Sequence, residues 1–135
     1  MSTWTHVAAV FRIDRIRPLQ GDAEDIEALI GKEEPYYDYI EGEFYRPTGS
    51  EGPLNWDLWI NPDRNHAAAY TLTVFGDLRD YDTDEPIIEW FKEVVKRSVF
   101  IRQAVCTINV EYPDRTTTIT VTRENNEPMF NINTL

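Results

Sequence analysis

Alternation of apolar and polar residues in five separate segments is the feature that most limits how this chain can fold. Such a period of two is typical of β-strands, because successive side chains of a strand point to opposite faces of a sheet. The five segments are residues 4–16, 54–60, 67–78, 101–112 and 116–122. In the first segment Val7, Ala9, Phe11 and Ile13 share one face, which we expect to be buried. The chain is therefore predicted to contain five strands.

Two other segments have the spacing of amphipathic helices. Residues 22–31 begin with acids and end at Gly31, a residue suited to the position that follows a helix. Residues 86–97 begin at Pro86 and end with basic side chains that complement the helix dipole. The predicted apolar faces are Ile26, Leu29 and Ile30 in the first helix and Ile87, Phe91, Val94 and Val95 in the second. Each helix therefore has one face suited to cover a sheet.

The order of these elements is β-α-β-β-α-β-β, and its first six members match the ferredoxin-like arrangement. We therefore predict that the 135 residues form a single α+β domain of the ferredoxin-like type. Two helices would cover one face of an antiparallel sheet, which an additional C-terminal strand extends. Two segments are predicted as a long acidic and aromatic loop at 32–53, for which a short strand at Tyr39–Tyr45 is the alternative, and a polar tail at 124–135. A loop of that length within a compact domain is often functional.

Negative charge is concentrated in one third of the chain. The net charge is −11, and residues 19–63 contain twelve acids against two bases, Lys32 and Arg46, which is a net charge of −10. Direct binding to nucleic acid needs a basic surface that replaces phosphate counterions, so this composition disfavours it. An acidic surface attracts basic partners instead, and ordinary solubility is the competing explanation.

Cysteine usage and hydropathy indicate the compartment. The single cysteine, Cys106, excludes an intrachain disulfide and lies in an apolar strand segment, where we expect a small core residue. The chain has no run of about 18 apolar residues that would cross a membrane, and Arg12 and Asp14 interrupt its N-terminal apolar stretch. We therefore expect a cytoplasmic protein without a signal peptide or a membrane partner.

No motif for catalysis, metal binding or phosphate binding is complete. Four aspartates and a glutamate within residues 77–85 resemble the start of a calcium loop, but Glu85 replaces the required glycine and Phe91 the required glutamate. Helix capping is the competing explanation for these acids, and a weak cation site or a metal-dependent enzyme is the alternative. The histidines, His6 and His66, have no neighbouring motif. We therefore predict no enzyme activity, no catalytic residue, no cofactor and no metal.

An acidic and aromatic surface is the leading candidate for a functional site. Aromatic side chains are enriched at interface hot spots, and complementary charge steers association with a basic partner. The loop at 32–53 contains both kinds of side chain, and Trp59 is expected on the open face of the sheet. The predicted partner-binding residues are Glu33, Glu34, Tyr36, Tyr37, Asp38, Tyr39, Glu41, Glu43 and Trp59. Packing of the tyrosines over the sheet is the competing interpretation.

Two alternative functions use other parts of the chain. Arg12, Arg15 and Arg102 lie at strand ends that the predicted fold brings together, where they would bind a small anionic ligand or a nucleotide. Pairing of these arginines with acids is the competing interpretation. The threonine-rich face of residues 116–122 predicts an exposed sheet surface or edge. Such an edge would allow strand pairing between chains in a homo-oligomer, either a homomeric or a virion assembly.

Size, acidity and predicted architecture together resemble the small acidic orphan proteins that bacteriophages and prophages encode. The resemblance covers the whole chain as a general type and includes the ferredoxin-like plan. Some proteins of that type inhibit host defence nucleoproteins by presenting carboxylates where nucleic acid would bind. The resemblance therefore implies a non-enzymatic inhibitor that acts in the host cytoplasm and binds the basic protein surface of a nucleic-acid-binding complex.

Overall fold

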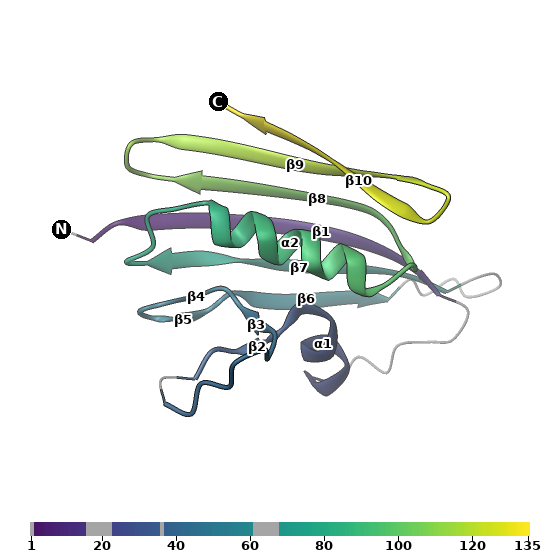
Figure 1. The fold of residues 1–135 in the computed structure, drawn as a ribbon, viewed down its shortest axis with the longest axis horizontal. Coiled ribbons are helices and arrows are strands. Elements are labelled where there is room, and N and C mark those ends of the chain that lie inside the picture. The colour runs from purple at the N-terminus through teal and green to yellow at the C-terminus, as the bar shows by residue number, and fades with distance from the viewer. Residues whose placement is uncertain (1, 16–22, 36, 61–67) are drawn as a thin grey trace.

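A six-stranded antiparallel sheet dominates the computed structural model, which describes residues 2–15, 23–35, 37–60 and 68–135 (Figure 1). The strands are β1 (Trp4–Arg15), β6 (Asn55–Ile60), β7 (Ala68–Arg79), β8 (Ile101–Val110), β9 (Arg115–Glu124) and β10 (Glu127–Thr134). Their order across the sheet is β10-β9-β8-β1-β7-β6. The five strands expected from alternation are confirmed to within two residues at each end, and β10 is additional.

Two helices accompany the sheet, α1 (Ala23–Ile30) and α2 (Glu85–Arg97). α2 lies across the middle of one face of the sheet, whereas α1 lies beyond β6 (Figure 1). The predicted apolar face of α2 is confirmed, since Ile87, Phe91, Val94 and Val95 are all buried. The indole Nε1 of Trp90 on α2 donates a hydrogen bond to the carbonyl oxygen of Ile30 at 2.7 Å. This buried bond joins the two helices.

The prediction of a ferredoxin-like plan, with two helices covering one face, is wrong. The chain is mostly strand, and only α2 lies across the sheet (Figure 1). α1 has eight residues and is about 12 Å long, whereas the twelve residues of β1 extend for about 40 Å. α1 buries only Ile26 and Ile30, and it lies at the side of the sheet, beyond β6 (Figure 1).

The residues expected to form a polar tail make a sixth strand. Asn125 and Asn126 have φ angles of 53° and 65°, which suit the two central positions of a tight β-hairpin. β10 then pairs with β9 from Glu127 to Thr134. Asn131 and Asn133 face the uncovered side of the sheet, so their polarity hid the alternation from sequence analysis. The new strand makes β9 an inner strand.

The core lies between α2 and the sheet. Phe11 of β1 is fully buried, with its ring centroid 5.4 Å from that of Phe91 and 6.2 Å from that of Trp90. Cys106 is also fully buried, and burial raises the pKa of its thiol to about 12, which confirms it as a core residue. The opposite face, which no helix covers, carries Val10 and Phe75 amid the threonines of β7, β8 and β9.

The segment expected as one long loop contains four strands of two residues each. β2 (Lys32–Glu33) pairs with β3 (Tyr45–Arg46), and β4 (Thr48–Gly49) pairs with β5 (Gly52–Pro53). A close approach at Gly31 fixes the start of this segment, because a Cβ there would lie 2.7 Å from the backbone nitrogen of Arg46. Gly31 also has a φ of 97°, which suits the position after α1. Neither helix is long and apolar enough to span a membrane in the described part of the chain.

Candidate functional site

A cavity of about 380 Å³ lies between residues 34–48 and α2. Its aromatic lining comes from Tyr39, Phe44, Tyr45, Tyr81 and Trp90. Four glutamates also line it, namely Glu34, Glu43, Glu89 and Glu93. We call this site the acid-rimmed cavity. The long segment after α1 supplies two of its carboxylates and α2 supplies the other two, so the fold assembles them from distant parts of the chain.

Local contacts hold the outer wall of the acid-rimmed cavity in place. The rings of Tyr39 and Tyr45 have centroids 5.2 Å apart, and the hydroxyl of Tyr45 accepts a hydrogen bond from the backbone nitrogen of Ile40 at 3.0 Å. The backbone nitrogen of Glu43 donates to the carbonyl of Ile40 at 3.2 Å. These bonds shape residues 39–45 into a defined turn whose tyrosines face the cavity.

Burial and the negative charge of the acid-rimmed cavity change the ionisation of one lining residue, Tyr81. The pKa of Tyr81 is raised to about 12, first because the phenol is largely buried and second because Glu34 is negatively charged. Three of the glutamates pair with surface cations, Glu43 with Lys32 at 3.2 Å, Glu89 with Lys92 at 3.6 Å and Glu93 with Arg97 at 3.3 Å. Exposed pairs of this kind contribute little to stability, so a partner's cation can replace the internal one.

Phe44, which lines the acid-rimmed cavity, already contacts a cation of the same chain. The guanidinium carbon of Arg97 lies 4.1 Å from the ring centroid of Phe44, within the range of a cation–π interaction. Arg46, by contrast, is buried in the floor and donates from Nη1 to the carbonyl oxygen of Gly31 at 3.1 Å. Burial lowers the pKa of Arg46, while the charges of Glu27 and Glu33 oppose that shift. Arg46 therefore anchors β3 and forms part of the floor of the acid-rimmed cavity.

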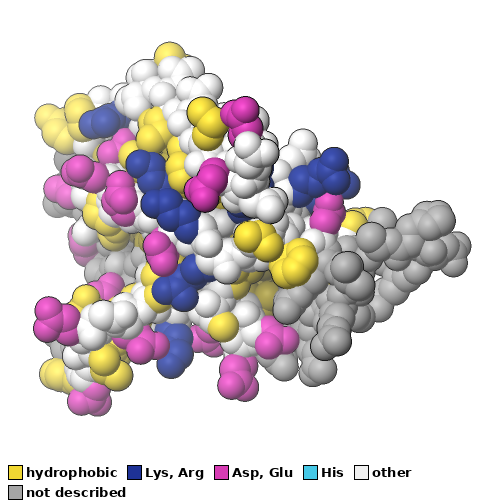
Figure 2. Space-filling model, turned by 45° about the vertical axis from the view of Figure 1, so that its right-hand side comes forward, with side chains coloured by type: hydrophobic (Ala, Val, Ile, Leu, Met, Phe, Trp, Pro, Cys, Tyr) yellow, Lys and Arg dark blue, Asp and Glu magenta, His cyan; other side chains and the backbone are white. Residues whose placement is uncertain are grey.

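The structure brings most of the predicted partner-binding residues together. Glu34, Tyr39 and Glu43 line the acid-rimmed cavity. The side chains of Glu33, Tyr37, Asp38 and Glu41 are exposed beside it. Figure 2 shows acidic and hydrophobic side chains intermingled at the lower left, where this segment projects. Tyr36 lies outside the described residues.

Trp59 is not part of this group. It pairs with Thr71 on the face of the sheet that lacks helices, and 56% of its surface is exposed. The acid-rimmed cavity instead uses Trp90, Glu89 and Glu93 of α2 together with Tyr81, none of which sequence analysis assigned to it. The spacing of Glu89 and Glu93, one helical turn apart beside the apolar face of α2, was the available signal.

Two arginines of the alternative anion site pair with an acid of the same chain, Asp14. Arg12 Nε lies 3.5 Å from Asp14 Oδ1, and Arg102 Nη1 lies 3.4 Å from Asp14 Oδ2. The side chain of Arg15 is outside the described part of the structure. Because the Asp14 carboxylate lies where an anionic ligand would bind to Arg12 and Arg102, this geometry disfavours the alternative site.

The aspartates of residues 77–85 point to different partners. The Asp80 carboxylate accepts a hydrogen bond from the Ser50 hydroxyl at 2.6 Å, and Asp84 accepts one from the buried Thr117 hydroxyl at 2.7 Å. Asp84 occupies the N-cap position of α2, but its side chain makes no capping hydrogen bond, because it binds Thr117 and pairs with Arg115 at 3.3 Å. Among the described residues, no three acidic, histidine or cysteine side chains are grouped as metal ligands.

His6 is held between two carboxylates at one end of the sheet. Its Nδ1 lies 2.6 Å from Asp77 and its Nε2 lies 2.7 Å from Glu111. The hydrogen bond with Asp77 and then the one with Glu111 raise the pKa of His6, so the doubly protonated ring is favoured. With both nitrogens engaged, His6 is poorly placed to act as a general base. His66 lies outside the described residues.

Comparison with protein-family models, with curated proteins and with solved structures finds no match to this chain. The resemblance to phage and prophage proteins therefore stays a prediction, and its ferredoxin-like component is corrected by the fold described above. The function has to be inferred from the geometry and charge of the acid-rimmed cavity and the segment beside it.

Proposed function

We propose that this protein is a non-enzymatic interaction protein that binds a basic surface of another protein through the acid-rimmed cavity and residues 33–43. The observation that carries the proposal is the cavity itself, in which aromatic walls lie beside four glutamates. A lysine or arginine side chain fits such a lining, because its aliphatic part packs on aromatic rings while its charged group meets carboxylates.

Exposed apolar residues next to the cavity support the same function. Tyr37, Tyr39 and Ile40 are 77%, 62% and 60% exposed, although residues of this kind are usually buried. Asp38 and Glu41 flank them and are exposed too. Apolar anchors surrounded by charge are the usual composition of a protein interface, with the anchors supplying affinity and the charges supplying steering.

The charge distribution favours a partner that normally binds nucleic acid. Glu33, Glu34, Asp38 and Glu41 form no ion pair with Lys or Arg among the described residues, so their charges are available. A row of exposed carboxylates can replace phosphates on a basic protein surface. We therefore extend the proposal to cytoplasmic inhibition of such a partner, as the phage-type resemblance implies.

A charge-neutralised variant tests the proposal. The variant carries Glu33→Gln, Glu34→Gln, Asp38→Asn and Glu41→Gln, and the probe is a synthetic arginine-rich peptide titrated by fluorescence anisotropy. We expect the variant to bind about tenfold more weakly than the wild type at low salt, because each exposed charge pair contributes roughly 0.2–1 kcal/mol. High salt should remove most of the difference.

A matched control removes four acids elsewhere, with Asp57→Asn, Asp82→Asn, Asp114→Asn and Glu124→Gln. It has the same net charge as the first variant but leaves residues 33–43 and the cavity intact. Its affinity for the peptide should stay within about twofold of the wild type. Equal weakening in both variants would show that only net charge matters and would overturn the proposal.

A further inference from the structure

The outer edge of β10 presents unpaired backbone groups. Thr116 and Leu135 exchange two backbone hydrogen bonds, at 3.1 and 2.8 Å, so they form a hydrogen-bonded pair of the antiparallel ladder. Such pairs alternate along a ladder, and Asn133, Asn131 and Met129 therefore also bond to β9. The residues between them direct their N–H and C=O groups away from the sheet, namely Phe130, Ile132 and Thr134. No hydrogen bond to these outward groups is present among the described residues.

β10 lacks most of the features that protect an edge strand from pairing. Natural edges are blunted by charged side chains, by proline, by bulges or by a covering segment. Residues 128–135 contain no charged side chain, β10 is the outermost strand of the sheet, and its C-terminal end lies at the top of Figure 1. Pro128 is the single protective feature, because it occupies an outward position where its missing N–H affects only outside partners. The rest of the edge is open to pairing.

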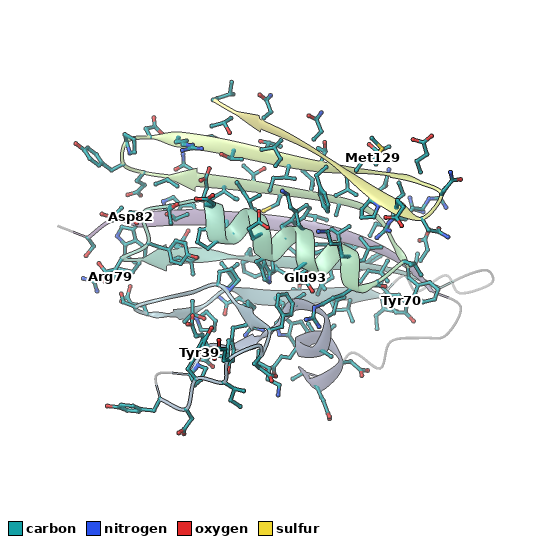
Figure 3. The ribbon with its side chains drawn as sticks, viewed as in Figure 1. Tyr39, Tyr70, Arg79, Asp82, Glu93 and Met129 are labelled. Carbon is teal, nitrogen blue, oxygen red and sulfur yellow. The ribbon has the colours of Figure 1, made fainter. Side chains whose placement is uncertain are left out.

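Three exposed apolar side chains repeat at every third residue along this edge. Met129, Ile132 and Leu135 are 57%, 42% and 87% exposed, and Figure 3 shows Met129 on β10. In an antiparallel pair of identical strands centred on Ile132, Met129 of one chain lies opposite Leu135 of the other. Ile132 then lies opposite its own copy, and Asn131 lies opposite Asn133. The edge is therefore self-complementary in one register.

We propose that two copies of this chain associate by antiparallel pairing of β10 with β10, centred on Ile132, and form one continuous sheet. In this register Phe130, Ile132 and Thr134 exchange backbone hydrogen bonds with Thr134, Ile132 and Phe130 of the second copy. The two-fold axis is perpendicular to the sheet, which is the isologous arrangement of most homodimers. Each copy of α2 stays on the same side of the extended sheet.

Charge also favours this edge as the contact. Two chains that each carry a net charge of −11 repel one another, so a contact costs least where neither chain presents acidic side chains. The acidic residues 33–43 lie beyond β6, on the far side of the sheet from β10 (Figure 1). The proposal is therefore independent of the proposed binding of a basic protein, and both can operate in one assembly.

Solution mass measurements by light scattering test the pairing. The wild type should have twice the chain mass of 15.8 kDa at high salt, where the repulsion between two negative chains is screened and the backbone bonds and apolar side chains of the contact remain. Ile132→Lys places two like charges opposite each other and should weaken association at least about tenfold. Thr122→Lys adds the same charge on β9, one strand inside the edge, and should leave the dimer intact.

A second variant separates loss of pairing from loss of folding. Ile132→Pro removes a backbone N–H that points outward, so the ladder with β9 loses no donor. Circular dichroism should show a folded chain while light scattering shows a monomer. A wild-type monomer at the highest soluble concentration would overturn the proposal. So would a dimer that survives both substitutions at Ile132.

Discussion

The two edges of the sheet are built in opposite ways. Beyond β6 lie α1 and the short strands β2 and β3, which cover that edge (Figure 1) and belong to residues 19–63, the stretch with a net charge of −10. β10, at the other edge, has no covering element and no charged side chain after Glu127. Exposed edge strands attract partners unless charge or a covering segment prevents it. The difference therefore indicates two separate contact surfaces, one for a basic partner and one for a second copy.

α2 is the element that both edges share. Trp90 on one side of α2 binds α1 through the carbonyl of Ile30, and Phe91 contacts Phe130 of β10, with ring centroids 6.4 Å apart. Neighbouring residues of α2 thus contact α1 at the covered edge, beyond β6, and β10 at the open edge. Substitutions in α2 should disturb both edges, while substitutions outside it should disturb only one.

Truncation of Phe91 should lower the stability of the protein more than any other substitution considered, because Phe91 belongs to α2, the helix that contacts both edges of the sheet. The side chain is fully buried and packs on Phe11 as well as Phe130. Phe91→Ala should lower the free energy of unfolding by about 3–5 kcal/mol, measured by urea denaturation. Tyr112→Ala, at a turn residue that is 80% exposed, should change it by less than about 0.5 kcal/mol. A small loss for Phe91→Ala would mean that α2 is not the common anchor.

Loss of Arg123 should destabilise the side of the sheet that carries β10. Its guanidinium donates to the carbonyls of Ile101 at 2.6 Å, of Val95 at 2.8 Å and of Ser98 at 2.8 Å, so it ties β9 to the end of α2. Arg123→Met removes all three bonds and should lower the free energy of unfolding by about 2–4 kcal/mol, measured by urea denaturation. Arg102→Met is the control, because that side chain is 70% exposed and contacts Asp14; its cost should stay below about 1 kcal/mol.

A methyl group at Gly31 should loosen the covered edge alone. Gly31→Ala places a Cβ 2.7 Å from the backbone nitrogen of Arg46 and forces a φ of 97° on alanine, at a cost of about 2 kcal/mol. Gly42 has a φ of 84° and nothing within 4 Å of an added Cβ, so Gly42→Ala should cost about 1 kcal/mol from the backbone alone. Hydrogen exchange should quicken in α1, β2 and β3 for Gly31→Ala and stay unchanged in β10.

The smallest expected effect is the contribution of His6 to the pH dependence of folding stability. His6 lies on the uncovered face of the sheet, between the two edges. Its folded pKa is raised above 6.5 by Asp77 and then Glu111, so its stabilising contribution is complete below about pH 6.5. That contribution is lost as the pH rises through the folded pKa. The side chain is 39% exposed, so solvent screening keeps the effect below about 1 kcal/mol.

His6→Gln checks this contribution by comparison of unfolding midpoints in urea. The stability lost on substitution should be greater at about pH 6 than at about pH 9, where the wild-type imidazole is neutral. His66 is present in both proteins, so its titration cancels in the difference. A loss that is the same at both pH values would contradict a charged His6 between the two carboxylates.

The regular elements could be predicted because their signals are local. Alternation located β1, β7, β8 and β9, and helical spacing together with Pro86 located α2, since a buried face imposes its period on the residues that form it. β10 was missed because it is an edge strand that is largely exposed, so solvent tolerates Asn131 and Asn133 on one face. Its one local signal was the Asn125-Asn126 pair, which suits a tight hairpin.

The sequence by itself determined five strands of the main sheet, the main helix, the buried position of Cys106 and the concentration of acids before β6, because each depends on local pattern or simple composition. Only the tertiary structure decided that α1 lies beside the sheet and that Glu89, Glu93 and Trp90 join Glu34 and Tyr39 around one cavity. Figure 3 shows Tyr39 on the projecting segment and Glu93 on α2, two elements that only packing brings together. Contacts between distant segments depend on how buried faces are shared, and that is a property of the whole fold.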